Sequence, residues 1–164
     1  MLAVRLEPAI EAELTKLALE TGRSKSYYVK EALAEYLLDR ADYLRAIAAL
    51  ERQEPRTSMA DVRAELGLSR WRLSALTVWR VEFLATAKRE LKKLDKRWQL
   101  AILDYLEDEI AGLENPRNRG KALVGDKQGL WRYRLADYRI ICEIHDTKLL
   151  IIAVTIGHRK NVYD

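Results

Sequence analysis

The chain has 164 residues, of which 49% are hydrophobic and 33% charged, so it can bury a core and has the composition of a soluble protein. Its longest apolar run, Leu149 to Val154, is too short to span a bilayer, and the first five residues lack the pattern of a signal peptide. The single cysteine, Cys142, lies in an apolar run, excludes a disulfide within the chain and agrees with a reducing cytoplasm.

The charge is unevenly distributed along the chain. Residues 1–68 contain 10 Lys and Arg against 12 Asp and Glu, whereas residues 69–164 contain 19 against 13, which gives net charges of −2 and +6. An acidic first part and a basic second part are expected to attract each other. The basic part is also the better candidate for electrostatic binding to nucleic acid.

The first forty residues predict one short strand and two helices. Apolar and polar residues alternate over residues 2–6, which is the period of a half-buried strand. Pro8 suits the first turn of a helix that stops at Gly22, and Ser24 suits the N-cap of the next helix. Because the backbone of a five-residue strand needs a partner, we expect it to pair with the same strand of a second molecule.

This order of strand, helix, Gly-Arg-Ser-Lys-Ser turn and helix resembles the ribbon-helix-helix family of dimeric DNA-binding proteins over residues 2–40. The resemblance implies that the paired strands enter the major groove of operator DNA, with Ala3 and Arg5 on their outer face. It also implies that Ser24 and Lys25 hold a phosphate at the start of the second helix. The alternative for Arg5 is an ordinary solvent-facing residue.

Residues 41–77 predict helices without a domain of their own. One helical stripe continues to Arg52, Pro55 interrupts it, and a second short helix is expected over residues 59–66. Such helices need an apolar surface to lie on. The segment resembles the C-terminal region of small antitoxins, which wraps the cognate toxin, and a plain helical linker is the alternative. The expected contacts with the toxin are Leu44, Ile47, Met59, Val62 and Leu66.

Residues 69–77 have no clear period and are the expected seam between two parts. A strand is predicted at 78–83, followed by helices at about 86–94 and 96–113 that end before Asn115-Pro116. These helices are densely basic. A solvated helix face and a surface for RNA or the ribosome both agree with this charge. The residues concerned are Lys88, Arg89, Lys92, Lys93, Lys96 and Arg97.

Strands are predicted over residues 131–135, 138–144 and 149–156. Arg132 and Arg134 project from one face of the first of these strands, because side chains alternate along a strand. The next strand carries Arg139, and the end of the chain carries Arg159 and Tyr163. Guanidinium groups gathered on one sheet surface suit a nucleic-acid backbone and the charge that builds on a reacting phosphate. An exposed polar sheet face is the alternative.

From residue 78 onward the chain resembles the RelE toxin family, whose members cleave messenger RNA in the ribosomal decoding site. The resemblance implies that Arg132 and Arg134 occupy the two basic positions of the second strand and Arg139 the phosphate-holding position of the third. Arg159 then matches the arginine after the last strand, and Tyr163 the terminal tyrosine. The resemblance is carried by Phe83 to Leu91, Leu113 to Pro116, Trp131 to Leu135, Asp137 to Ile140 and Gly157 to Tyr163.

RNA can be cut without a metal when its own 2′-hydroxyl attacks the adjacent phosphorus. Arginine stabilises the resulting charge but accepts a proton poorly. Some relatives carry lysine in place of Arg132 and Arg134, so the identity of the general base stays open, with His158 and Tyr163 as candidates for proton transfer. The sequence has no zinc-ligand spacing, Gly-rich phosphate loop or serine nucleophile motif, and we expect no metal and no cofactor.

The sequence therefore predicts an α+β protein with a DNA-binding module at 1–40, a toxin-neutralising segment and linker at 41–77, and a toxin domain at 78–164. We expect a cytoplasmic single-chain antitoxin and toxin whose partners are a second copy, operator DNA and, after release, the ribosome and messenger RNA. One alternative is a non-enzymatic DNA-binding repressor with an inactive RelE/ParE-like domain. Another is the related ParE group, which targets gyrase and generally lacks the arginine and tyrosine set.

Overall fold

The computed structural model describes residues 1–69, 77–123 and 129–159, so Tyr163 and most of the expected seam lie outside the described residues. The chain divides into two compact units, residues 1–38 and residues 39–164. Within the described ranges, no helix combines the length and the apolar character that crossing a membrane requires.

The first unit contains the two predicted helices. Helix α1 spans Pro8–Thr21, has proline in its first turn and ends at Gly22, whose φ of 68° is the left-handed conformation that glycine adopts readily. Helix α2 spans Lys25–Glu51 and continues into the second unit. At its start the Ser24 side chain accepts a hydrogen bond from the amide of Tyr27 at 3.1 Å. Residues 1–7 form neither helix nor strand within the single chain, so the predicted strand over residues 2–6, which needs a second copy, stays a prediction.

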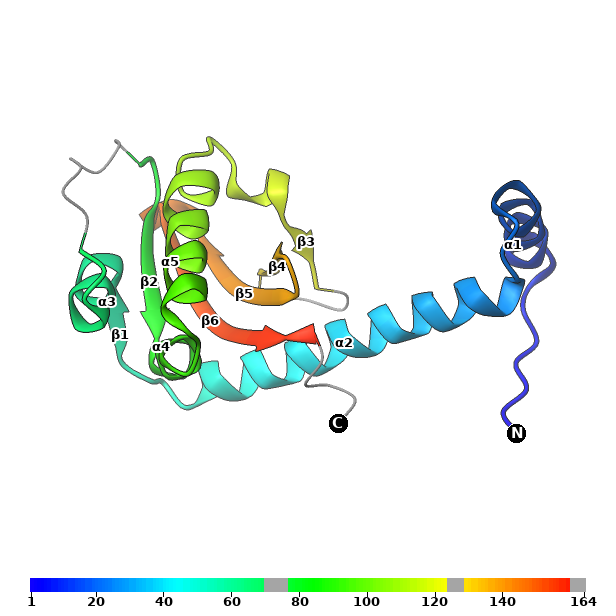
Figure 1. The fold of residues 1–164 in the computed structure, drawn as a ribbon, viewed down its shortest axis with the longest axis horizontal. Helices are drawn as coiled ribbons and strands as arrows, with labels where there is room; N and C mark the ends of the chain where they lie inside the picture. The colour runs from blue at the N-terminus through cyan, green and yellow to red at the C-terminus, as the bar shows by residue number, and fades with distance from the viewer. Residues whose placement is uncertain (70–76, 124–128, 160–164) are drawn as a thin grey trace. The chain divides into compact units, whose positions relative to one another are not determined.

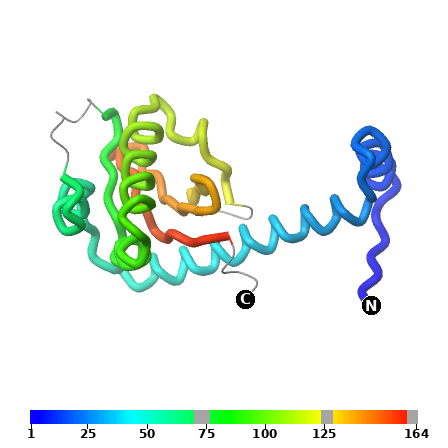
Figure 2. The backbone as a smooth tube through the Cα atoms, viewed as in Figure 1, coloured from blue at the N-terminus to red at the C-terminus, as the bar shows by residue number. Residues whose placement is uncertain are grey.

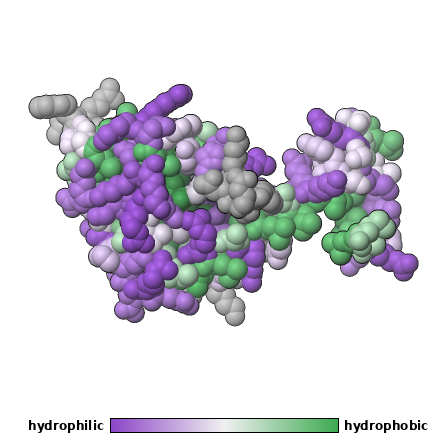
Figure 3. Space-filling model, turned by 60° about the horizontal axis from the view of Figure 1, so that its bottom comes forward, coloured by the Kyte–Doolittle hydropathy of each residue, from purple (hydrophilic) through white to green (hydrophobic). Residues whose placement is uncertain are grey.

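The first unit leaves many of its apolar side chains uncovered. Helix α1 buries none of its residues. Figure 3 shows apolar surface on the part of the molecule that carries this unit. A domain of 38 residues is too small to bury a core alone, so this surface calls for a covering partner. The exposed apolar residues include Leu2, Val4, Ile10, Leu17, Val29, Leu33, Tyr36 and Leu37.

The second unit is built on a sheet (Figure 1). Within the described residues, six strands form it in the order β1-β2-β6-β5-β4-β3, with β2 parallel to β6 and every other neighbouring pair antiparallel. The strands are β1 Arg56–Ser58, β2 Arg80–Leu84, β3 Lys121–Ala122, β4 Leu130–Leu135, β5 Tyr138–His145 and β6 Leu150–His158. The longer strands agree with the sequence pattern, whereas β1 and β3 are too short to produce an alternation and were not predicted.

Short helices accompany this sheet. Ser58 caps α3 by accepting from the amide of Asp61 at 3.1 Å, and Gly67 ends it, as predicted. The predicted helix over 96–113 is shorter than expected, because a π-helical turn follows α5 and ends at Ile110. The elements are α3 Met59–Leu66, α4 Ala85–Lys92, α5 Lys96–Asp104, the π-helical η1 Tyr105–Ile110, and the 3₁₀ turns η2 Pro116–Arg119 and η3 Asp146–Lys148.

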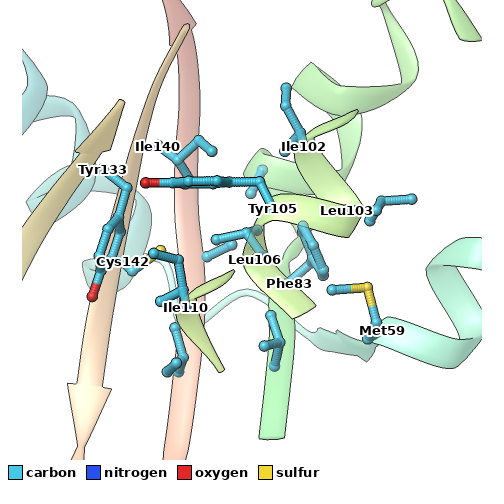
Figure 4. Close-up of a cluster of buried hydrophobic side chains, with 14 of the residues drawn as sticks. Met59, Phe83, Ile102, Leu103, Tyr105, Leu106, Ile110, Tyr133, Ile140 and Cys142 are labelled. Atoms are coloured by element: carbon cyan, nitrogen blue, oxygen red, sulfur yellow. The ribbon is translucent and has the colours of Figure 1, made fainter. Parts of the chain in front are cut away.

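One face of the sheet packs against α3, α4, α5 and η1. Phe83 of β2, Tyr133 of β4 and Ile140 of β5 are fully buried there, together with Leu106 of η1 (Figure 4). Met59, Val62 and Leu66 of α3 belong to the same cluster. Helix α3 therefore shares its core with the strands that follow it in the sequence.

The opposite face of the sheet packs against the C-terminal half of α2, which runs alongside β6 in Figure 2. Ala46 and Ala49 are fully buried against Ile141 and Val154, and Ile47 is partly buried beside them. Leu44 was expected among these contacts, but its side chain is 57% exposed. The expectation was wrong because Leu44 lies on the solvent side of the helix, turned away from the face that carries Tyr43 and Ala46.

Candidate functional site

The arginines singled out by the sequence gather at one end of the sheet. Arg134 of β4 lies opposite Arg139 of β5, which in turn lies opposite Gly157 of β6. The amide of Arg159 donates to the carbonyl of Asp137 at 2.8 Å, so Arg159 follows β6 at this same end. The predicted alternation holds along β4, where Tyr133 enters the core on the other face.

Arg132 and Arg139 are not on an exposed polar face, which was one interpretation of their alternation. Their side chains are only 6% and 3% exposed. Both donate to the same oxygen of Asp39, and Arg139 Nε also donates to Asp42 at 2.6 Å. The acidic partners missing from the neighbouring sequence thus come from α2, about a hundred residues earlier.

Asp39 and Asp42 reach these arginines because they share one stripe of α2 with Ala46 and Ala49. The spacing of three, four and three residues places all four side chains on the helix face toward the sheet. Alanines at two of the positions allow a close approach of helix and sheet, and the aspartates at the other two meet the guanidinium groups. A stripe that would otherwise be apolar therefore ends in two buried carboxylates.

Burial raises the pKa of these two carboxyl groups, whereas pairing with arginine lowers it. Burial pushes the pKa of Asp39 upward, but the guanidinium groups of Arg132 and Arg139 outweigh it and lower the pKa overall. Burial dominates for Asp42, whose pKa is raised despite its bond to Arg139. Asp42 is consequently the first of the two to take up a proton as the pH falls.

A further ion pair joins α2 to the same region with the charges reversed. Arg45, three residues beyond Asp42, donates to the carboxylate of Glu90 on α4. The other Glu90 oxygen accepts from the amide of Ile156 at 2.6 Å. Asp39, Asp42 and Arg45 thus present two negative charges and one positive charge, complementary to Arg132, Arg139 and Glu90.

A cleft of about 390 Å³ lies beside these pairs. Its walls come from α2, α4 and the adjoining ends of β5 and β6, and they include Arg139, Glu90, Lys93 and His158. The ring of His158 packs edge-on against Tyr138 with centroids 5.0 Å apart. Arg132 and Arg139 are buried, whereas Arg134 and Arg159 are exposed, so part of the arginine-bearing region is open.

The basic helix α4 also meets acidic groups from the N-terminal part of the chain. Glu65 of α3 accepts from Lys88 at 3.2 Å and from Lys92 at 2.7 Å. The ammonium group of Lys96 donates to the carbonyl of Leu66. Lys93 instead lines the cleft, and Arg97 lies 5.8 Å from the ring centre of Trp98.

Glu54, just before β1, occupies the start of α4. Its carboxylate accepts from the amide of Thr86 at 2.6 Å and from the Thr86 hydroxyl at 2.7 Å. Arg89 lies 3.7 Å away and Arg52 donates at 2.8 Å. Burial raises the pKa of Glu54, but the hydrogen bonds from Thr86 and Arg52 outweigh it and bring the pKa to about 2.

The same segment is also anchored by Arg63 of α3. Its guanidinium, 5% exposed, lies 2.8 Å from Asp104 and 2.7 Å from Glu107. Strand β1 adds a further attachment by pairing antiparallel with β2. Residues 39–68 therefore bind the following domain through a strand, two helices and buried charges.

Other titratable groups stand apart from this arrangement. Cys142 is completely buried, and burial raises its pKa far above the ordinary value, so it is a poor nucleophile. His145 lies 3.1 Å from Glu143, at the opposite end of β5 from Arg139.

The residues expected to contact DNA are exposed in the first unit. Ala3 and Arg5 lie in the segment before α1, and Ser24 and Lys25 lie at the start of α2. Lys25 also pairs with Glu11 at 3.2 Å. The structure thus brings Ser24 and Lys25 to one helix start, and places Ala3 and Arg5 on a separate extended segment.

Sequence reasoning missed the residues that cover the arginines. Asp39, Asp42 and Arg45 were read as part of an unremarkable helix, and Glu90 as part of a basic one. One signal was available, because Asp39 and Asp42 occupy the positions in register with Ala46 and Ala49, where an amphipathic helix normally carries apolar residues. An acidic residue at such a position predicts a buried cation opposite it.

The fold and the site together define a small sheet domain in which two aspartates of a helix cover the buried arginines Arg132 and Arg139. Residues 81–163 match the family described as the ParE toxin of the type II toxin–antitoxin system parDE. Toxin RelG of Mycobacterium tuberculosis is 28% identical over 83 residues, which cover 51% of this chain and 93% of that protein. Toxin RelE of the same organism is 31% identical over 85 residues, which cover 52% and 86%.

Among solved structures, the toxin–antitoxin complex RelBE2 of M. tuberculosis aligns with a TM-score of 0.46 and 25% identity, covering 52% of this chain and 95% of that chain. By the sequence match over its second half, the chain belongs to the ParE/RelE family of toxins from type II toxin–antitoxin systems.

Proposed function

We propose that this protein is an antitoxin and a toxin in one polypeptide. In this proposal the toxin half is a metal-independent, ribosome-dependent mRNA endonuclease, and residues 39–68 hold it inactive. Residues 1–38 bind operator DNA as a dimer and repress transcription. Arg132, Arg134, Arg139, Arg159 and Tyr163 form the catalytic set.

The observation that carries the proposal is the pairing of Arg132 and Arg139 with Asp39 and Asp42. A carboxylate that accepts from a guanidinium stands where a phosphate oxygen of RNA would lie, because both are anions that accept two parallel N–H bonds. RNA cannot reach these arginines until α2 moves away. The basic residues of α4 are occupied in a similar way by Glu54 and Glu65.

The tether strengthens this restraint. Because both halves belong to one chain, the acidic helix competes with RNA at a high effective concentration that dilution does not lower. Release then requires proteolysis of the N-terminal half or a change that pulls α2 away from the sheet. The buried side chains of α3 add to the cost of such a release.

The DNA-binding part of the proposal is supported by the exposed apolar surface of the first unit. A strand at residues 2–6 and the apolar residues of α1 and α2 would all be covered by a second copy. The exposed Arg5, Ser24 and Lys25 would then lie on the surface that meets DNA.

A second candidate activity follows from the family description, which names ParE toxins. Members of that group target gyrase. The two activities leave different products, since one cuts translated messages and the other arrests gyrase on DNA. A repressor with an inactive second half would produce neither.

The test uses the full-length chain with Asp39→Arg and Asp42→Arg, hereafter the released chain, expressed inducibly in cells. Two arginines opposite Arg132 and Arg139 repel them and open the site. We expect growth arrest with new 5′ ends inside translated messages. Growth arrest with DNA breaks and intact messages would assign the gyrase activity instead. Growth without either product would support the non-enzymatic repressor.

A further inference from the structure

Four of the five residues of the proposed catalytic set are arginines, which are poorly suited to accept the proton of the attacking 2′-hydroxyl. Arginine stays protonated across the physiological pH range. Within the described residues, the cleft beside Arg139 contains one carboxylate contributed by the toxin half, which is Glu90. This inference rests on the proposed function, since it assigns a residue to that reaction.

The geometry points to Glu90 as the proton acceptor of the RNA cleavage reaction. Its carboxylate is held in place by the amide of Ile156 at 2.6 Å, which leaves the second oxygen directed at another donor. In the restrained chain that donor is Arg45. When α2 is displaced, the same oxygen becomes available to a hydroxyl of the bound RNA.

The charges of α2 support this assignment. Asp39 and Asp42 take the place of the anionic phosphate opposite Arg132 and Arg139, and Arg45 takes the place of a hydrogen-bond donor opposite Glu90. Successive members of this series are three positions apart, so one side of the helix carries groups that match both the acceptor and the donor character of the substrate. Helix α2 thus matches Glu90 as well as the two arginines, although covering the arginines alone would not require Arg45.

The 2′-hydroxyl transfers its proton to Glu90 as its oxygen forms a bond to phosphorus, and the bond from phosphorus to the 5′-oxygen breaks. The leaving 5′-oxygen takes a proton from water, and Glu90 later returns its proton to solvent. The products are a 2′,3′-cyclic phosphate and a 5′-hydroxyl end.

Burial raises the pKa of Glu90, outweighing its bonds to Ile156 and Arg45, and so brings the carboxylate closer to the range in which a general base works at neutral pH. Other charged or titratable groups face it from each neighbouring element. They are Asp42 and Arg45 of α2, Lys93 of α4, Tyr138 and Arg139 of β5, and His158 of β6.

A purely structural role for Glu90 would be to accept the hydrogen bond from the backbone amide of Ile156. Glu90→Gln separates the two roles, because the amide oxygen still accepts from Ile156 but does not accept a proton from the substrate. The test measures single-turnover cleavage of messenger RNA on ribosomes by the released chain across a pH series. Glu114→Gln is the matched control, since that side chain is exposed in the same half.

We expect Glu90→Gln to slow cleavage by about a hundredfold or more and to remove the acidic limb of the pH profile, while Glu114→Gln changes neither. Cleavage within about threefold of the released chain, or slower cleavage with an unchanged acidic limb, would overturn the assignment. If the released chain itself cleaves nothing at any pH, the proposed nuclease activity fails and this inference fails with it.

Discussion

Asp42 of α2 accepts a hydrogen bond from Arg139 of β5 at 2.6 Å, and both side chains are about 3–4% exposed. A buried charge is tolerated only when it is paired, so each residue requires the other. The pair joins a helix that begins in the proposed DNA-binding unit to the strand that carries the proposed phosphate-holding arginine.

Operator binding should depend on Arg5. We expect Arg5→Ala to weaken binding to the protein's own promoter by about 1–3 kcal/mol, the scale of a lost base contact, as measured by fluorescence anisotropy at fixed salt. Lys16→Ala removes the same charge from an exposed position on α1 and serves as the control. An equal loss in both variants would assign Arg5 a general electrostatic role.

The first unit should dimerise through its apolar surface. Leu33, 48% exposed on α2, is expected to be covered in the dimer, so Leu33→Glu should convert the protein to a monomer. Sedimentation velocity at micromolar concentration measures this directly. Leu100→Glu alters a leucine of α5 that is 40% exposed in the other unit and should leave the dimer intact. A monomeric unaltered protein would contradict the dimer.

Glu54 should stabilise the second unit in a pH-dependent way. Its folded pKa of about 2 lies below its ordinary value of 4.5, so its contribution is present above about pH 4.5 and is lost as the pH falls toward 2. We expect Glu54→Gln to lower the free energy of unfolding by about 1.5–3 kcal/mol at pH 7, because it loses charge-assisted hydrogen bonds to Thr86. Urea unfolding at several pH values should show the difference shrinking below pH 4.5. A difference that does not change with pH would argue against this role.

Arg159 should act on the RNA without supporting the fold. Its side chain is exposed, so Arg159→Ala in the released chain should leave the melting temperature unchanged. Cleavage should fall by about a hundredfold or more, the usual effect of removing one donor to a developing charge. Arg80→Ala removes an exposed arginine at the opposite end of the sheet and should retain cleavage. Full activity of the Arg159→Ala variant would remove this residue from the catalytic set.

The local elements were largely predictable from the sequence, because their signals are local. The Ser58 cap and Gly67 stop fix the limits of α3, and alternation fixes which face of β4 carries Arg132. The short strand β1 gives no such signal, since three residues pair with β2 only through tertiary contacts. The π-helical turn after α5 similarly depends on packing and shortens a helix that the sequence pattern extends further.

The arginines of the candidate site were also identified from the sequence, but their burial and their pairing with aspartates were not. Charge and alternation locate Arg132 and Arg139 on one face of a sheet. That pattern agrees equally with a face exposed to solvent and with a face covered by another part of the protein. Their partners, Asp39 and Asp42, lie about a hundred residues away, so only the fold reveals the pairing. Glu90 could not be identified from the sequence for a related reason. The charged side chains around it come from elements that are distant in the sequence, and only the fold brings them together.

The central claim is that the carboxylates of α2 restrain the toxin half, and one comparison tests it most directly. The rate of messenger RNA cleavage is measured in a purified translation reaction for the unaltered chain and the released chain at equal concentration. Glu31→Arg with Glu51→Arg makes the same charge change at exposed positions of α2 and is the control. Breaking a buried pair costs about 3–5 kcal/mol, so we expect the released chain to cleave about a hundredfold faster or more, with the control matching the unaltered chain. Equal rates for the unaltered and released chains would contradict the account.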